Sequence, residues 1–333
     1  MKICVVLLTG LGDVVHGLPV VNAIKRTWPD AHITWVVEPM PSGMLRPHPS
    51  VDEVVVFHKQ AGWAGVRRLR AELRQHHFDI ALNFNIYFKS VFPTFFSRAR
   101  RRIGFERGRA RDGVWLFANE HLAPGPRRHT QDLFLEFLEV LGIRAEPLQW
   151  LIPLTESEQL EQESFFNDLR DRPVVGVVGA SANERKDWPA QRYPELVDAL
   201  VADFNAHVVL LGGPGTREQG IARQITEHAQ HRPIWALGDS IRRLTWLIDG
   251  CQLVIAPDTG PVHIARALEV PVIGLYGHTN PWRVGPYRKY EDLWIDRYNE
   301  PGAAPDASQA EPKHGRMEQI SVADVLEKVA CVL

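Results

Sequence analysis

Short apolar runs alternate with segments of helical periodicity along this chain, and the alternation is found in both halves. Such alternation predicts parallel β-sheets whose two faces are covered by helices. For the first half, the predicted strands are 2–8, 32–37, 53–57 and 79–83, and the predicted helices lie near 14–28, 63–76 and 129–141.

The same pattern restarts in the second half. The predicted strands are 173–178, 206–211, 233–236, 252–256 and 271–275, and the predicted helices lie near 155–169, 189–203, 216–229, 240–248 and 260–268. A chain of 333 residues is long enough for two cores. We therefore expect α/β domains at 1–160 and 161–315, then a C-terminal helix at 316–333 that could pack back on the first domain. Residues 299–316 are expected to form a polar, Pro-rich loop.

Composition narrows the class of protein. An apolar content of 45% with 23% charged residues is typical of a soluble globular protein. No apolar run reaches the roughly 20 residues that span a bilayer, and the apolar start at 1–8 is interpreted as a buried strand rather than a signal peptide. The three cysteines are far apart, which predicts neither a disulfide framework nor a metal site and fits a reducing cytoplasm.

The charge is unevenly distributed although the net charge is only −2. Residues 1–150 contain 20 Lys and Arg against 14 Asp and Glu, and nine arginines lie between Arg98 and Arg128. This excess is either a solvated face or a surface for an anionic partner. Nucleic acid is not the expected partner, because the isoelectric point is near 6.7 and no nucleic-acid-binding motif is present.

The segment 253–268 reads as a strand, a tight Asp258-Thr259-Gly260 turn and a helix. Strand, turn and helix in this order direct backbone N–H groups and the positive end of a helix dipole at one point. Gly260 permits close approach of a ligand, and Pro261 suits the first helical turn. The segment predicts either a phosphate-binding turn or an ordinary capped connection.

Other strand ends supply further candidates, because ligands of open α/β sheets bind beyond the carboxyl ends of the strands. Asp13 follows the first strand, where a carboxylate would repel a pyrophosphate but could serve as a base; the alternative is a helix N-cap. Lys186 could reach a phosphate or be merely solvated. Glu218 follows the Gly-rich stretch 212–215 and could hold ribose hydroxyls. No Asp-x-Asp pair, metal-ligand spacing or Gly-x-Ser-x-Gly motif occurs.

Four of these stretches, in this order, resemble glycosyltransferase family 9, the ADP-heptose:lipopolysaccharide heptosyltransferases. They are Gly12-Asp13-Val14-Val15-His16 with Leu18-Pro19, Arg185-Lys186-Asp187-Trp188-Pro189, Leu211-Gly212-Gly213-Pro214-Gly215 and Pro257-Asp258-Thr259-Gly260-Pro261-Val262-His263. The similarity spans residue 1 to about 290. Residues 277–287 are most similar to members that add the first heptose to Kdo.

The resemblance implies a GT-B fold: two Rossmann-like, doubly wound parallel-sheet domains facing a central cleft. It implies an acceptor site on the first domain, an ADP-heptose site on the second, and inverting transfer without a metal or cofactor. The implied partners are ADP-heptose, Kdo-lipid A and, transiently, the inner-membrane surface. The enzyme is expected at the cytoplasmic face of that membrane.

The motif match also assigns residues. It implies that Asp13 is the catalytic base and that Lys186 acts near the donor phosphates. The implied donor-binding residues are Ser181, Lys186, Glu218, Asp258, Thr259, Gly260, Pro261 and His263. The implied acceptor-binding residues are Gly12, Arg67, Arg68, Arg70 and Lys89. Ala182 stands where many first-heptose enzymes carry a second hydroxyl residue.

Three alternatives remain open at this point. The chain could add a later heptose or modify another acceptor, or it could be a nucleotide-dependent oxidoreductase. Val15 and Asp13 in the first turn argue against the oxidoreductase. It could also bind an ADP-sugar without catalysis. The aromatic stretch 84–96 is expected to be a buried helix or to meet a lipid surface.

Overall fold

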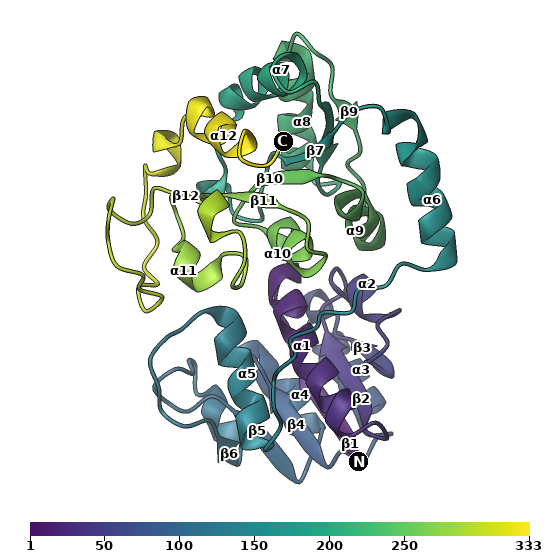
Figure 1. Cartoon of the computed structure of the whole chain (residues 1–333). Helices are drawn as coiled ribbons and strands as arrows, with labels where there is room; N and C mark the ends of the chain where they lie inside the picture. Colours follow the sequence, from purple (N-terminus) through teal and green to yellow (C-terminus); the bar gives the residue numbers. More distant parts are fainter. The chain divides into compact units, whose positions relative to one another are not determined.

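The computed structural model describes all 333 residues as two compact units, unit 1 at Met1–Pro153 and unit 2 at Leu154–Leu333 (Figure 1). The division falls before helix α6 (Glu156–Phe166), whereas the sequence placed it at 160/161. Helix α6 belongs to unit 2 because Gln162 Nε2 donates to the carbonyl of Trp246 at 2.8 Å.

Unit 1 contains a six-stranded parallel sheet with the order β3-β2-β1-β4-β5-β6. Strand β1 is central and buried from Ile3 onward, as expected for a parallel sheet covered on both faces. The strands are β1 (Lys2–Val6), β2 (His32–Val37), β3 (Glu53–Val56), β4 (Ile80–Asn83), β5 (Arg101–Gly104) and β6 (Glu120–His121).

Helices cover both faces of this sheet. The helices are α1 (Leu11–Thr27), α2 (Ser42–Leu45), α3 (Gly62–Leu73), α4 (Val91–Phe96) and α5 (Thr130–Val140). Helices α1 and α5 pack together in front of the sheet in Figure 1, and α3 and α4 pack together behind it. Gly17 lets α1 lie directly on β2, because a Cβ at this position would be 2.6 Å from Trp35 Cη2.

Unit 2 repeats the architecture with the order β12-β11-β10-β7-β8-β9. Its parallel strands are β7 (Val174–Val178), β8 (His207–Leu211), β9 (Ile234–Trp235), β10 (Leu253–Pro257), β11 (Val272–Tyr276) and β12 (Ile295–Asp296). The chain winds outward in opposite directions from β7 and β10, so a ligand crevice is expected where the loops after these strands separate.

The helices of unit 2, besides α6, are α7 (Tyr193–Ala202), α8 (Thr216–His228), α9 (Ile241–Asp249), α10 (Gly260–Ala267), α11 (Pro281–Val284) and α12 (Val322–Val329). Helix α12 was expected to pack back on the first domain. It instead contacts α7, and its buried residues Val322, Val325 and Val329 belong to the core of unit 2.

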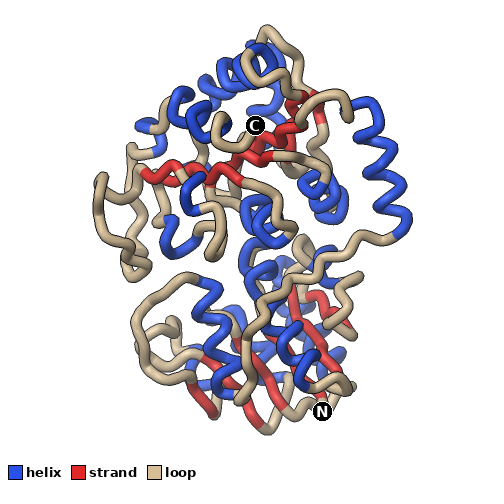
Figure 2. Tube along the Cα trace, in the orientation of Figure 1, coloured by secondary structure: helices blue, strands red, loops and turns tan.

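Residues 297–314 contain no helix or strand, in agreement with the predicted loop (Figure 2). The loop is anchored nevertheless, because Asn280 Nδ2 donates to the carbonyls of Asp306 and Gln309 at 2.7 and 3.1 Å. No helix of the protein combines the length and the apolar character that a membrane crossing requires.

Candidate functional site

The donor residues predicted from the sequence gather at one edge of unit 2, in the loops that follow β7, β8 and β10. Lys186 lies in a short 3-10 helix (Glu184–Lys186) after β7. Asp258 directly follows β10, which pairs with β7. Residues more than 70 positions apart are thus brought into contact by strand order alone.

The centre of this edge is an ion pair between Lys186 and Asp258, with Nζ 2.7 Å from Oδ2. Thr279, in the loop after β11, donates from Oγ1 to the same oxygen at 2.8 Å. The Asp258 side chain is 7% exposed and that of Lys186 is 28% exposed. One carboxylate therefore connects three loops of the site.

The pKa of Asp258 is lowered from its ordinary value. Burial opposes ionisation, but the positive charge of Lys186, the nearby His263, and the hydrogen bonds from Lys186 and Thr279 outweigh it. Asp258 is therefore a charged, fixed anchor for Lys186 near neutral pH.

Helix α10 begins beside this pair. Thr259 is its N-cap residue in an extended conformation, and its side chain makes no capping hydrogen bond. Pro261 has no N–H, and the N–H of Val262 donates to the Thr259 carbonyl at 3.1 Å. Gly260 is the first residue of the helix, and a helix N-terminus favours an anion through its unpaired N–H groups and the positive end of its dipole. His263 is buried one turn into the helix.

The loop carrying Lys186 is held by Ser181, by Asp187 and by Arg217, which the sequence did not single out. Asp187 Oδ1 accepts from the backbone N–H of Ser181 at 2.6 Å. Arg217, at the start of α8, donates to Asp187 Oδ2 and to the carbonyl of Ser181. The hydroxyl of Ser181 donates to the Asn183 carbonyl at 2.7 Å. Ser181 and Arg217 thus shape the loop in this structure.

Glu218 lies at the third position of α8 and stabilises the loop before it. Its two carboxylate oxygens accept from the N–H groups of Gly213 and Gly215 at 3.3 and 3.1 Å. Beside it is an apolar recess, almost filled by side chains, that lies between the ends of β7 and β8. The recess is lined by Val177, Gly179, Ala180, Leu210, Leu211, Gly212, Glu218, Ala222, Ile225 and Leu237.

His278 is a buried residue of this edge that sequence reasoning passed over. Its Nδ1 lies 2.7 Å from the carbonyl of Lys313, and its own carbonyl accepts from the Lys313 N–H at 3.0 Å. Because a carbonyl only accepts, Nδ1 carries the proton and Nε2 is an acceptor in the neutral ring. Burial chiefly lowers the pKa of His278, and neighbouring cations such as Lys186 add to the effect.

In unit 1, the structure places Asp13 after the central strand β1, at the point where the sheet order reverses between β1 and β4. The helix N-cap is Gly10, so Asp13 is a half-buried first-turn residue and the N-cap alternative is wrong. Gly12 precedes it in the same turn. Lys89 follows β4 and forms an ion pair with Glu38 at 3.1 Å.

The three arginines predicted to bind the acceptor lie on α3. Arg67, Arg68 and Arg70 are exposed, while Gly65 and Leu69 face the core. They lie in the second and third turns of the helix, which begins at Gly62. Their role stays a prediction.

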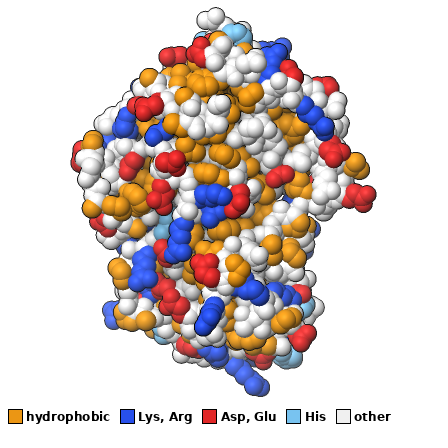
Figure 3. All heavy atoms as spheres, viewed as in Figure 1, with side chains coloured by type: hydrophobic (Ala, Val, Ile, Leu, Met, Phe, Trp, Pro, Cys, Tyr) orange, Lys and Arg blue, Asp and Glu red, His pale blue; other side chains and the backbone are white.

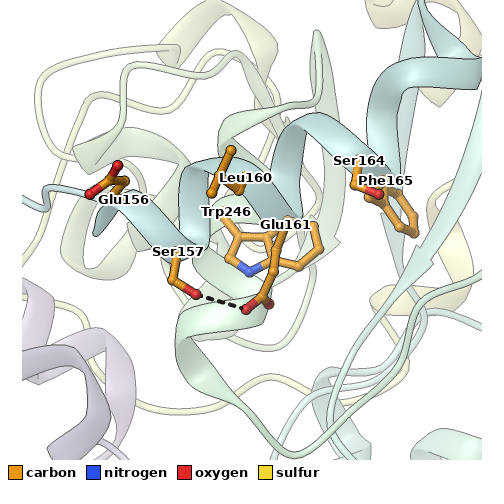
Figure 4. Close-up of a pocket in the computed structure, with 7 residues that line it drawn as sticks. All are labelled: Glu156, Ser157, Leu160, Glu161, Ser164, Phe165 and Trp246. Atoms are coloured by element: carbon orange, nitrogen blue, oxygen red, sulfur yellow. Dashed lines mark hydrogen bonds between the residues drawn. The ribbon is translucent and has the colours of Figure 1, made fainter.

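A surface groove of about 730 Å³ lies elsewhere, between α6 and α9 (Figure 4). It is lined by Glu156, Ser157, Leu160, Glu161, Ser164, Phe165 and Trp246. These residues include two carboxylates and no cation, so the groove is unsuited to a diphosphate. No group of three or more His, Cys, Asp or Glu side chains is placed to hold a metal ion.

The chain is similar in sequence to known proteins. The sequence model of glycosyltransferase family 9 (heptosyltransferase) matches residues 66–309. The lipopolysaccharide core heptosyltransferase OpsX of Haemophilus influenzae is 31% identical over 294 residues, covering 88% of this chain and 83% of that protein.

Two solved structures share the fold. A glycosyl transferase family 9 protein from Veillonella parvula superposes with a TM-score of 0.85 at 22% identity, covering 99% of this chain and 96% of that one. The E. coli heptosyltransferase WaaC with ADP gives a TM-score of 0.77 at 22% identity, with both chains fully covered. The expected GT-B pair of Rossmann-like parallel sheets is confirmed.

Proposed function

Because this chain belongs to glycosyltransferase family 9, we propose that it transfers L-glycero-D-manno-heptose from ADP-heptose to a Kdo residue of the lipopolysaccharide inner core. The observation that carries the proposal is the Lys186–Asp258 pair at the start of α10. It combines a held cation with a helix N-terminus, which together suit the diphosphate of a nucleotide-sugar. The relative WaaC, whose solved structure contains ADP, supports this choice of donor.

The donor is expected to lie along the carboxyl edge of the unit 2 sheet. Its diphosphate contacts Lys186 and the first turn of α10, around Gly260. Its adenosine lies toward β8, where Glu218 offers carboxylate oxygens to ribose hydroxyls and the apolar recess beside it offers a surface for the base. A base would enter this recess only if Leu237 or the 212–215 loop moved aside.

The reaction is a single displacement at the anomeric carbon. Asp13 takes the proton from the acceptor hydroxyl as its oxygen bonds to that carbon. The bond from the anomeric carbon to the phosphate oxygen breaks, and ADP leaves with the electron pair. Lys186 and the Gly260 N–H stabilise the charge that develops on the leaving ADP. A single displacement inverts the configuration of the sugar.

The acceptor is a lipid, so the enzyme is proposed to work at the inner-membrane surface as a peripheral protein. Gly12, Lys89 and the arginines of α3 are proposed to bind the anionic acceptor sugars. The family relationship supports a glycosyl acceptor.

The test is incubation of the pure protein with ADP-heptose and Kdo2-lipid A, followed by mass spectrometry of the lipid. A product heavier by one heptosyl residue is expected. Transfer only to a lipid that already carries heptose would assign a later step in core assembly. Binding of ADP-heptose without transfer to either lipid would refute the catalytic proposal.

A further inference from the structure

One face of unit 1 presents aromatic side chains to solvent. Of the five aromatic side chains among the exposed large hydrophobic residues of the molecule, four lie between residues 63 and 95: Trp63 at 73% exposure, Phe95 at 61%, Phe88 at 49% and Tyr87 at 42%. They belong to α3, to α4 and to the short turn before α4. This face lies on the side of the sheet opposite α1 and α5.

These rings form one connected surface. Phe92 contacts Trp63, Phe88 and Phe96 with centroid distances of 6.1–6.2 Å. Phe95 continues the chain from Phe96, at 5.9 Å, to Phe117, at 6.3 Å. We call this surface the aromatic face; it consists of Trp63, Phe88, Phe92, Phe95 and Phe96.

The stretch 84–96 is therefore neither wholly buried nor wholly exposed. Val91 and Thr94 of α4 are almost fully buried against the sheet, at 4% and 1% exposure. Phe95 of the same helix is largely exposed, at 61%. The Phe95 ring contacts the rings of Phe96 and Phe117, and most of its surface is open to solvent.

Arginines surround part of the aromatic face. A groove of about 400 Å³ is lined by Arg70, Arg74, Phe95, Phe96, Arg98 and Arg102, with no carboxylate among them. Arg102 is occupied by the carbonyls of Ala99 and Phe117. Arg70 lies over the Phe96 ring at 6.0 Å, and Arg70, Arg74 and Arg98 form no ion pair.

This distribution differs from that of the other arginines nearby. Arg101 is paired with Glu120 at 2.8 Å, and Arg109 is paired with Glu106 and Glu136. On the opposite face, seen in Figure 3, acidic and basic side chains are interspersed. Uncompensated cations beside the aromatic face would repel one another, and an anionic partner would relieve this repulsion.

We propose that the aromatic face docks on an anionic phospholipid surface and that the arginine-lined groove receives lipid phosphates. Trp and Phe rings partition into the boundary between headgroups and acyl chains. Arginine binds phosphate through a planar pair of donors, and each basic residue near an anionic leaflet strengthens binding about fivefold. The proposal rests on the proposed function only in that a lipid acceptor requires such a surface.

The test measures co-sedimentation of the full-length protein with vesicles of equal parts phosphatidylglycerol and phosphatidylcholine. The wild type is expected to bind these vesicles, to bind pure phosphatidylcholine far less, and to be released by high salt. The double variant Trp63→Ser/Phe95→Ser should bind at least 10-fold more weakly. Arg74→Gln/Arg98→Asn should bind roughly 25-fold more weakly, at about fivefold per arginine.

Matched controls come from unit 2. Trp235→Ser removes the remaining exposed aromatic side chain, and Arg223→Gln/Arg232→Gln removes two exposed arginines that have no ion pair. Both controls should bind as the wild type does. Thermal melting of each variant verifies that the surface changes leave the fold intact.

Activity separates this proposal from the proposed function. Trp63→Ser/Phe95→Ser should retain transfer to a deacylated, water-soluble acceptor and lose it toward the lipid in vesicles. Equal vesicle binding by wild type and both face variants would overturn the docking proposal whatever the turnover. A wild-type dimer that Trp63→Ser/Phe95→Ser converts to a monomer, with vesicle binding unchanged, would overturn it in favour of a subunit interface.

Discussion

Replacing Lys186 by Met tests whether Asp258 needs its cation. The change would leave a carboxylate with a 7% exposed side chain and a single side-chain donor, Thr279. Loss of one member of a buried ion pair costs about 3–5 kcal/mol. The Lys186 side chain is 28% exposed, so water weakens the ion pair. We therefore expect Lys186→Met to lower the free energy of unfolding by about 2 kcal/mol.

The assay is thermal and urea unfolding of four proteins: wild type, Lys186→Met, Asp258→Asn and the double variant. At about 2–4 °C per kcal/mol for a unit of this size, Lys186→Met should lower Tm by roughly 4–8 °C. The double variant should recover most of that stability, because no charge is left buried. Its affinity for ADP should stay low, since the cation that faces the diphosphate is absent.

The matched control is Lys289→Met, which breaks an ion pair with Glu269 in the same unit. Its distance is similar, 3.2 Å, but its side chains are 35% and 70% exposed. The expected loss is below about 0.5 kcal/mol. Equal effects of Lys289→Met and Lys186→Met, or an unimproved double variant, would refute the reasoning.

The pH dependence adds a second check. The pKa of Asp258 in the folded protein lies below its ordinary value. Its ionised carboxylate therefore contributes to the stability of the fold above about pH 4, and this contribution is lost as the pH falls through the pKa of the folded state. Without Lys186, burial is less opposed and that pKa rises. The stability difference between wild type and Lys186→Met should therefore narrow as pH falls from 7 toward 4.

Further predictions concern single residues. Asp13→Asn should lower kcat at least 100-fold with little change in the Kd for ADP-heptose, measured by calorimetry; undiminished kcat would remove Asp13 from the base role. Arg217→Gln should raise KM for ADP-heptose more than it lowers kcat, because the loop of Lys186 loses its clamp; a change in kcat alone would contradict this. Gly277→Ala should lower the free energy of unfolding by about 1–3 kcal/mol, because the new Cβ would lie 2.5 Å from backbone atoms of Arg316 and Met317. Gly220→Ala is the control and should not destabilise the protein, because a Cβ there meets nothing within 4 Å. In native thiol titration only Cys331 should react, because burial raises the pKa of the other two cysteines, and labelling of more than one thiol would show local opening.

The sequence predicted the central strands of both sheets and the edge strands β3 and β9, but it missed β5, β6 and β12. Continuous apolar runs mark β1, β2 and β10, which are buried on both faces. Strand β6 is an edge strand and pairs with β5. Their residues include Arg101 and Glu120, which form an ion pair across the two strands. A strand of two to four residues with charged side chains carries no apolar signal, and its pairing depends on tertiary contacts that a linear pattern does not contain.

The candidate site divides in the same way. Asp258 and Lys186 were predicted because each follows a recognisable strand, and parallel strands end at a common edge. Arg217 was missed, and Asp187 was quoted in a motif without a role, because their contact joins segments 30 residues apart in the sequence. Thr279 also follows a predicted strand, so the rule that found Asp258 would have found it as well.

The 299–316 loop shows how far a compositional interpretation reaches. Its polar, Pro-rich sequence correctly predicted the absence of helix and strand, which suggests a passive connection. In the structure, Lys313 pairs with His278 through two hydrogen bonds, and the adjacent Thr279 holds the carboxylate that holds Lys186. Lys313 positions His278, the neighbouring Thr279 positions Asp258, and Asp258 positions Lys186. The loop thus contributes to the orientation of Lys186 without contacting it. A residue's part in such a chain depends on its neighbours' backbone groups, which explains why composition alone predicted the loop and not its role.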